Sequence, residues 1–596
     1  MKKLLPVLIA VVLLPGCQNI DHKPAPSKQA SSSMSAIGKV FEDYHEERLK
    51  LYPQEATMAG DNRYDDLLPN NLTDSNRSNL AAFYRKYLTA LSRFDRGGLS
   101  ADEQMSHDVL KWECEINLKQ LQFPTHLLPI NQFESLHLQI GQWAGGTSAQ
   151  PFKTVRDYEN WLKRLDAFTE WCGVAVSRMR EGMKRGYVLP KPLIEKVVPQ
   201  MADLAKGPVE THVFYGPIKF IPSSISTTDR TRLTTAYAEK IREKIIPAFS
   251  HLQEFFSKEY LPAGRTSSGI SEIPNGREYY KLQIQTYTTT DLSADEVFQL
   301  GEREVKRLLE EMEKVRKTVG FQGDMKAFFD HVRTKKELIP FKEPQQVIDN
   351  FNAIHRKMQP ALNRLFNLVP RTKFEVRRTE AFREASASAE YMQGSVDGTR
   401  PGIFYVPIPT IAEYNLYSDE DLFLHEAIPG HHYQISLQQE NSRLPQFRRT
   451  LWYSAYGEGW ALYCESLGKE LGLYDDPYQY FGMLSAEMHR AIRLVVDTGI
   501  HAKGWTREQA IRYSLDHEAE SEASIVAEIE RYMAWPGQAL SYKVGQLKIR
   551  ELRARAEKEL GGRFDIREFH DRVLESGCLP LRVLEQKIDR WIREKR

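Results

Sequence analysis

Residues 421–434 read DLFLHEAIPGHHYQ, and the chemistry of the chain centres on them. An apolar run leads into three histidines and a glutamate within eight residues: His425, Glu426, His431 and His432. Imidazoles are good zinc ligands, and a catalytic zinc keeps one coordination position open for water. A carboxylate directly after the first histidine is placed to take a proton from such a water. The stretch therefore predicts a Zn²⁺ site that includes His425, with Glu426 as the general base of a hydrolytic reaction.

The second histidine is not where a regular helix requires it, because the position four residues after His425 is Pro429. His431 would lie about 9 Å along the axis of a regular helix, too far for two imidazoles to share one ion. Pro429 disfavours a regular helix, and Gly430 tolerates unusual dihedral angles. We therefore expect a bulge that returns His431 to the second-ligand position. A longer bulge would select His432 instead, which otherwise faces substrate or supports a ligand.

A third protein ligand is expected from residues 456–465, YGEGWALYCE, which read as a buried aromatic helix. Glu458 is the candidate, because a buried carboxylate needs a partner and a metal ion is one. Glu465 follows two helical turns later on the same face, where it would orient a ligand histidine. The alternative for Glu458 is a charge on a solvated helix face.

Two further segments carry weaker signals. Asp497 and His501 are four residues apart on an expected buried helix, so Asp497 either hydrogen-bonds a ligand imidazole or forms a core ion pair with Arg493. Tyr542 follows a Pro-Gly pair and is the candidate donor to a developing oxyanion, with Tyr532 as the alternate. Each tyrosine alone is more often a core residue than a catalytic one.

The N-terminus, MKKLLPVLIAVVLLPGC, has two lysines and then an apolar run too short to span a bilayer. Its end resembles the bacterial lipoprotein signal, in which residues 1–16 are removed and Cys17 is lipidated; the alternatives are an ordinary signal peptide and a buried start helix. Residues 17–35 then comprise the lipidated cysteine and a flexible, Pro- and Ser-containing tether. By this resemblance the protein lies on the periplasmic side of the envelope, and glutamine at position 18 favours the outer membrane. The lipid would be its only contact with the membrane.

The remaining sequence predicts a mostly α protein with small β-sheet elements. Capping boxes begin at Ser100 and Ser293, and a long helix over Thr154–Arg185 ends before a glycine. Tyr280–Gln285 and Gly402–Val406 are the strand candidates. A soft boundary divides an N-terminal helical half, residues 36–370, from a metal-binding half, residues 371–596. Lys and Arg number 81 against 80 Asp and Glu, so no basic field predicts a nucleic-acid partner.

Four motifs in order, HEAIPGHH, EGWALYCE, RLVVDTGIH and PGQALSYKVG, resemble the bacterial domain-of-unknown-function 885 family. DYENWLKRL and LSADEVFQLGEREV extend the likeness into the N-terminal half, so that it covers roughly residues 36–596. That family resembles helical zinc peptidases such as thimet oligopeptidase and the Taq-type carboxypeptidases. Their third ligand is a glutamate followed seven residues later by an acidic residue, which corresponds to Glu458 and Glu465, and a similar tyrosine segment corresponds to Tyr542.

The resemblance implies a zincin-like fold, in which two helical halves flank a deep cleft, and a zinc peptidase that hydrolyses short or unfolded peptides. Two alternatives stay open from the sequence. One is a non-catalytic binding lipoprotein with a vestigial metal site. The other is a metal-dependent hydrolase of a different amide, such as a cell-wall peptide. Ligand types do not distinguish zinc from other divalent metals, and nothing in the sequence indicates an oligomeric state.

Overall fold

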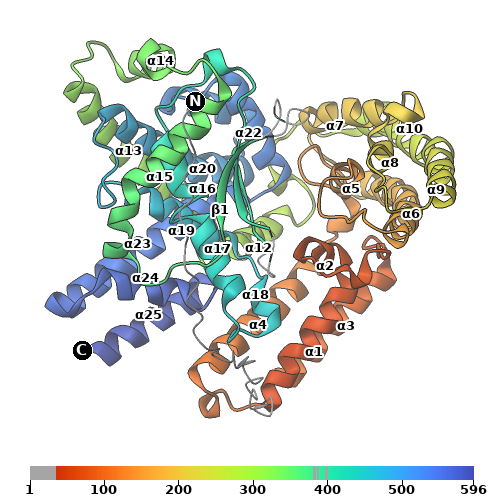
Figure 1. Ribbon diagram of the computed structural model, residues 1–596, viewed down its shortest axis with the longest axis horizontal. Helices are drawn as coiled ribbons and strands as arrows, with labels where there is room; N and C mark the ends of the chain where they lie inside the picture. Colours follow the sequence, from red (N-terminus) through yellow and green to blue (C-terminus); the bar gives the residue numbers. More distant parts are fainter. Residues whose placement is uncertain (1–34, 380–383, 385–387, 396–399) are drawn as a thin grey trace, which may run out of the picture.

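The computed structural model describes residues 35–379, 384, 388–395 and 400–596, and helices make up most of it (Figure 1). The prediction of a mostly α fold with a small sheet is therefore confirmed. The predicted signal peptide, Cys17 and the tether as far as residue 34 lie outside the described residues. Within the described part, no helix has both the length and the apolar character needed to cross a lipid bilayer.

The long helices begin and end where local capping signals predict. Ser100 accepts a hydrogen bond from the Glu103 backbone N–H, and the Glu103 carboxylate accepts the backbone N–H of Ser100, at the start of α4 (Ala101–Gln120). The second predicted capping box forms in the same way. α6 (Val155–Arg185) ends at Gly186, whose φ of 79° is a left-handed conformation that suits glycine.

Two hydrophobic cores hold the helices together. The smaller core forms the lobe on the right of Figure 1. Its main helices are α5 (Leu136–Ala144), α6, α7 (Lys191–Leu204), α9 (Thr227–Lys240) and α10 (Ile246–Phe255), with the short α8 (Gly216–Lys219) and α11 (Leu261–Ala263) beside them.

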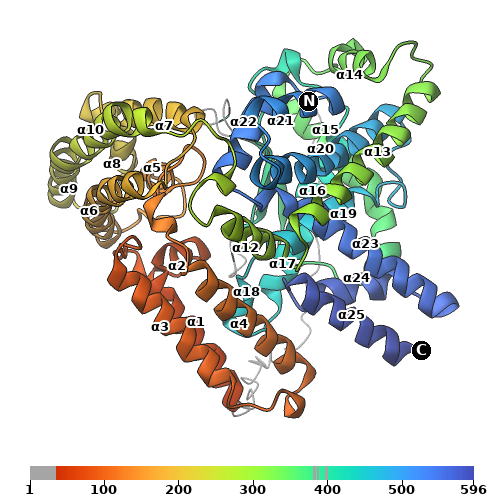
Figure 2. The ribbon, with the colours of Figure 1, turned by 180° about the vertical axis from the view of Figure 1, so that it is seen from behind.

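The larger core joins the first helices to the rest of the chain. Figure 2 shows the arrangement of these helices from behind. Residues on both sides of position 370 contribute to this core. Besides α4, its helices are α1 (Ala36–Leu51), α3 (Asp74–Leu91), α12 (Gly276–Thr288), α13 (Ala294–Thr318), α14 (Met325–Thr334), α15 (Pro344–Leu365), α16 (Asp419–Glu426), α17 (His431–Glu440), α18 (Gln446–Arg449), α19 (Ser454–Glu465), α20 (Pro477–Ala502), α21 (Arg507–His517), α22 (Glu522–Ala534), α23 (Ser541–Leu560), α24 (Ile566–Leu574) and α25 (Leu581–Lys595). The short α2 (Pro53–Ala59) follows α1 and belongs to neither core.

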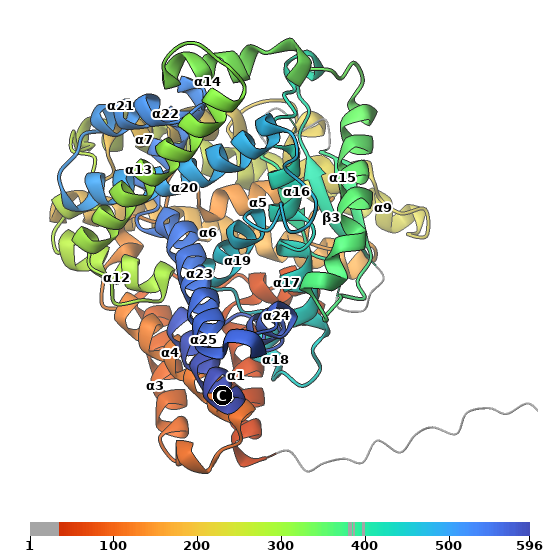
Figure 3. The same ribbon diagram turned by 90° about the vertical axis from the view of Figure 1, so that its left-hand side faces the viewer.

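A three-stranded sheet lies between α15 and α16 (Figure 3). Its order is β1-β3-β2, with β1 (Phe374–Arg378) parallel to β3 (Gly402–Val406) and β2 (Glu390–Met392) antiparallel to it. The ring of Phe404 in β3 packs 5.0 Å from Phe351 of α15. β3 is buried along its whole length, which confirms the strand predicted from this apolar run. Phe374 of β1 packs 6.0 Å from Phe423 of α16, so the sheet supports the helix that carries the first histidine.

The other predicted strand, Tyr280–Gln285, is wrong. These residues lie inside α12. Tyr280, Leu282, Gln283 and Ile284 are all buried, because several helices surround this segment. A segment enclosed on more than one side has no single apolar face, so an alternating pattern does not identify a strand there.

Candidate metal centre

Helix α16 ends at Glu426, and a short non-helical connection separates it from α17. A Cβ atom built on Gly430 would lie only 1.9 Å from the carbonyl oxygen of His425, so only glycine fits this close approach. The expected bulge within one helix is therefore replaced by a complete break between two helices. The new helix begins at His431, which brings this imidazole back toward the end of α16.

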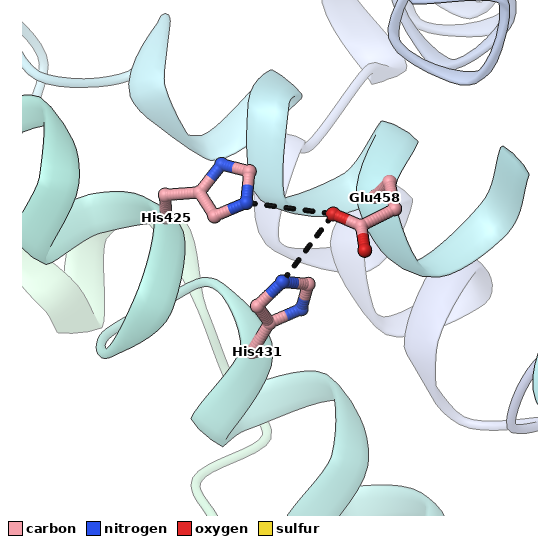
Figure 4. A group of neighbouring side chains, drawn as sticks. All are labelled: His425, His431 and Glu458. Carbon is pink, nitrogen blue, oxygen red and sulfur yellow. Dashed lines mark ion pairs between the residues drawn. The ribbon is translucent and has the colours of Figure 1, made fainter. Parts of the chain in front are cut away.

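Three side chains from three helices converge at this break (Figure 4). His425 Nε2 and His431 Nε2 each lie 3.5 Å from Glu458 Oε2, and one ligand atom from each residue lies within 4.8 Å of the others. Two ligand atoms bound to one tetrahedral zinc at about 2.0–2.1 Å lie about 3.4 Å apart. The three residues therefore have both the chemistry and the spacing that a zinc ion requires.

A second carboxylate holds the first imidazole in place. His425 Nδ1 lies 2.7 Å from Glu465 Oε1, and both side chains are almost completely buried. With Nε2 turned toward Glu458, Nδ1 carries the proton and donates it to Glu465, which fixes the tautomer of the ring. The structure thus places Glu465 at the contact that its two-turn spacing from Glu458 predicted.

The electrostatics of the group favour a cation. Burial disfavours a charged His425, but hydrogen bonds to Glu458 and Glu465 outweigh it and raise the pKa of His425 to about 10. Burial also disfavours the Glu458 carboxylate, yet His431 and His425 hold the pKa of Glu458 well below its usual range. The carboxylates of Glu458 and Glu465 therefore stabilise a positive charge at the point where the two imidazoles meet. A proton supplies it in the metal-free protein.

Glu426 is the last residue of α16, directly beside the first imidazole. Burial raises the pKa of its carboxyl group, and Glu458 adds to the shift, whereas His425 and His431 oppose it. A carboxyl group with a raised pKa exchanges protons closer to neutral pH, as a general base must.

His432 lies away from the group and faces the sheet. Its Nδ1 is 2.9 Å from the Tyr391 hydroxyl, and its ring packs 5.0 Å from Phe374. Burial lowers the pKa of His432 to about 4, so the ring is neutral at physiological pH. Of the two candidates for second ligand, the structure brings His431, and not His432, to Glu458.

Asp497 and His501 do not join the group either. Asp497 accepts hydrogen bonds from the Tyr280 hydroxyl, at 2.5 Å, and from the backbone N–H of Gly537. It therefore bonds neither of its predicted partners, a ligand imidazole or Arg493. His501 Nδ1 accepts the Ile270 backbone N–H, and its Nε2 donates to a backbone carbonyl. These contacts tie α20 to segments distant in sequence, which helical spacing within α20 does not reveal.

The two candidate tyrosines, Tyr532 and Tyr542, both contact Arg493, one through its hydroxyl and the other through its ring. The Tyr532 hydroxyl lies 2.7 Å from Glu528 Oε2 and also accepts a hydrogen bond from Arg493 Nε. Tyr542, in the first turn of α23, packs its ring under the same arginine, 4.5 Å from Cζ. The Tyr532 hydroxyl is therefore engaged in an ionic network, whereas Tyr542 contacts that network through its ring.

Asp421 is a neighbour that sequence reasoning missed. It lies one helical turn before His425 on α16 and is 3% exposed. Burial raises the pKa of Asp421 well above its usual range, and the nearby Glu465 adds to the shift. The sequence does contain a signal for Asp421, because a spacing of four residues places it on the same helix face as His425.

A pocket of about 670 Å³ reaches the candidate ligands only through Trp452, because none of the ligands themselves is among its lining residues. Trp452 lines it, with its ring 5.8 Å from that of His431, and the indole is 43% exposed. The ring also covers Gly457, where a Cβ would lie 2.1 Å from an indole carbon. The glycine that precedes Glu458 therefore gives Trp452 its position between the candidate ligands and the pocket.

A sequence profile of bacterial proteins of unknown function, DUF885, matches residues 53–588. This chain belongs to the DUF885 family. The family resemblance noted from the four motifs is thereby confirmed, whereas the further resemblance to zinc peptidases is not part of this finding.

Two solved structures are similar to this DUF885 protein. One is the crystal structure of the putative lipoprotein from Colwellia psychrerythraea, with a TM-score of 0.86, 27% identity, and coverage of 94% of this chain and 100% of that one. The other is a putative lipoprotein of unknown function from Shewanella oneidensis, with a TM-score of 0.68, 18% identity, and coverage of 93% and 99%. The second likeness shows the fold alone. Among curated proteins, none matches this sequence.

Proposed function

We propose that this DUF885 protein is a zinc-dependent peptidase. The observation that carries the proposal is the convergence of His425, His431 and Glu458, with 3.5 Å between each imidazole Nε2 and the shared carboxylate oxygen. Two neutral imidazoles and one carboxylate are the protein ligands of many catalytic zinc sites, and they leave one position open. Glu465 supports the set by holding His425 in the tautomer that a metal needs.

A zinc ion held by these residues would polarise the substrate carbonyl and lower the pKa of a water molecule toward about 7. Glu426 takes a proton from the attacking water on its carboxylate and passes it to the nitrogen of the leaving amine. Tyr542 donates its hydroxyl to the oxygen of the carbonyl that is attacked. The raised pKa of Glu426 suits both halves of this proton transfer.

The pocket beside Trp452 supports a peptide as the substrate. It lies between α1–α2 on one side and α17–α18 on the other, and Met58 and Trp452 expose apolar surface in it. A volume of about 670 Å³ accommodates a few side chains but no folded domain. We therefore assign to the protein short or unfolded peptides, and a zincin-like arrangement whose substrate cleft includes this pocket.

We place the protein on the periplasmic side of the bacterial envelope, anchored to the outer membrane through lipid on Cys17. The sequence around Cys17 supports this location, and so does the similar Colwellia psychrerythraea protein, which is described as a putative lipoprotein. The test is fractionation of cells that make the wild type or Cys17→Ser.

The test of the function combines metal content with activity. Wild type, Glu458→Ala, His431→Ala and Glu426→Gln are analysed by mass spectrometry for metal and assayed with a mixed peptide library. His251→Ala, in the exposed surface of α10, is the matched control. We expect about one zinc per chain in the wild type and the control, and its loss in the two ligand variants. Glu426→Gln keeps the metal and loses cleavage by about 10²-fold or more.

The other outcomes discriminate between the remaining functions. Bound metal without peptide cleavage, but with hydrolysis of cell-wall peptides, would assign a different amide substrate. Bound metal with no hydrolysis, and no effect of Glu426→Gln, would indicate a binding lipoprotein with a vestigial site. Wild type without metal would contradict the proposal.

A further inference from the structure

A second pocket, whose lining includes none of the residues of the candidate metal centre, is rich in positive charge. It has a volume of about 250 Å³ and lies between α4, α18, α24 and α25. Figure 2 shows these helices at the same end of the molecule. We call it the arginine pocket and define it by its five basic lining residues: Arg443, Arg448, Arg572, Lys587 and Arg590.

The acidic residues of this pocket do not balance the basic ones. Three carboxylates line it, and Glu575 pairs with both Arg572, at 2.9 Å, and Lys587, at 3.1 Å. Among the described residues, none of the other three arginines has a carboxylate oxygen within 4 Å of its guanidinium. The lining thus contains more positive charge than its own acidic groups neutralise.

Arg448 is the residue that this imbalance affects most. It is only 1% exposed, and it donates to the Ser106 hydroxyl and to the Ser576 backbone carbonyl, which are both uncharged. Its Nε has no hydrogen-bond partner among the described residues. A buried guanidinium without a counter-charge is costly, and an anion in the pocket would remove that cost. Burial lowers the pKa of Arg448 to about 10, although Tyr453 and the more distant Asp102 carboxylate oppose this shift.

Helix α25 presents its cations to the pocket from one face. Lys587 and Arg590 recur at helical spacing along that face, followed by the carboxylate of Glu594, whereas Arg593 does not line the pocket. Guanidinium groups hold phosphate and carboxylate oxygens through paired N–H donors, and phosphate brings the larger charge. We propose that the arginine pocket binds an oxyanion of the phosphate type.

Two sources of such a group fit the position of the pocket. One is a free phosphate compound of small size. The other is the headgroup of an anionic phospholipid, because the tether ends next to the pocket: Ser35 hydrogen-bonds Glu103, and the adjoining Ala101 and Asp102 line the pocket. The lipid source rests on the proposed anchoring through Cys17, whereas the oxyanion site itself does not.

The experiment uses the chain from residue 17 onward with Cys17→Ser, so that no attached lipid binds membranes. Inorganic phosphate is titrated by ³¹P NMR against sodium chloride of equal ionic strength. Arg590→Gln is compared with Arg593→Gln, which removes the same charge from the same helix outside the pocket. Arg443→Gln is a second test at an exposed position, because Arg448 variants risk misfolding.

We expect saturable phosphate binding that Arg590→Gln and Arg443→Gln weaken about 10-fold or more and Arg593→Gln leaves unchanged. Co-sedimentation with phosphatidylglycerol vesicles, but not with phosphatidylcholine vesicles, that is lost in Arg590→Gln would identify a lipid headgroup as the source. Phosphate binding without vesicle binding would identify a free phosphate compound. Phosphate binding no stronger than that of chloride would overturn the proposal, as would equal weakening by Arg590→Gln and Arg593→Gln.

Discussion

Replacing Glu465 by glutamine tests whether the carboxylate behind His425 governs metal affinity. Glu465 is 1% exposed, and its Oε1 lies 2.7 Å from His425 Nδ1. Outer carboxylates of this kind change metal affinity about 10–100-fold, which corresponds to about 1.4–2.7 kcal/mol. We expect a loss in the upper half of this range for two reasons. Glutamine removes the negative charge, and its NH₂ group would be buried at Oε2, which has no partner among the described residues.

The assay is competition for zinc against a chromophoric chelator at neutral pH. Glu470→Gln is the matched control, because it also removes one carboxylate close in sequence but only breaks a partly exposed ion pair with Arg553. Circular dichroism shows whether both variants are folded. We expect the control to bind zinc as the wild type does.

An unchanged zinc affinity in folded Glu465→Gln would refute the reasoning, because His425 would then not depend on this hydrogen bond as a ligand. Equal losses in Glu465→Gln and Glu470→Gln would attribute the effect to overall charge. A loss of zinc together with a loss of fold would be resolved by Glu465→Asp, which keeps the charge but withdraws the oxygen from Nδ1, and which we expect to weaken binding less than glutamine does.

Three further predictions concern pH, packing and location. Burial disfavours a charged His425, but its carboxylate neighbours raise its pKa to about 10, above the ordinary value. A proton must therefore leave His425 before the metal binds. We expect zinc affinity to rise with pH up to about 10 for this reason. Calorimetry in buffers of different ionisation enthalpy measures this release, and buffer-independent heats would contradict it. Gly545→Ala places a Cβ 1.8 Å from a backbone oxygen of α19 and lowers the free energy of unfolding by about 1–3 kcal/mol, whereas Gly173→Ala, with open space around it, is neutral or stabilising in the same thermal unfolding assay. Cys17→Ser moves the protein from the membrane fraction to the soluble fraction; continued membrane association would disprove anchoring by lipid.

Helix ends and the buried strand were predictable because their causes are local. A serine that bonds the N–H three residues later, or a glycine in a left-handed conformation, acts within one turn of the chain. The apolar run at 402–406 is short, bounded by prolines and buried on both faces, and it forms β3. By contrast, Tyr280–Gln285 forms part of a helix, because its burial comes from surrounding helices rather than from a sheet.

The same distinction applies to the candidate metal centre. The sequence alone identified His425, Glu426, His431 and Glu458 as candidates, because ligand chemistry and helical spacing are properties of residue type and order. It also indicated that the helix cannot continue through Pro429, since proline lacks an N–H.

Only the tertiary structure decided which candidates meet. The break after α16 aims His431 at Glu458 and turns His432 toward the sheet, and one residue of register separates these outcomes. Asp497 and His501 find their partners on α12 and in segments far away in sequence. The arginine pocket is likewise assembled from four separate helices. Such contacts depend on how helices pack in three dimensions, and the spacing of residues along one helix contains no information about its neighbours.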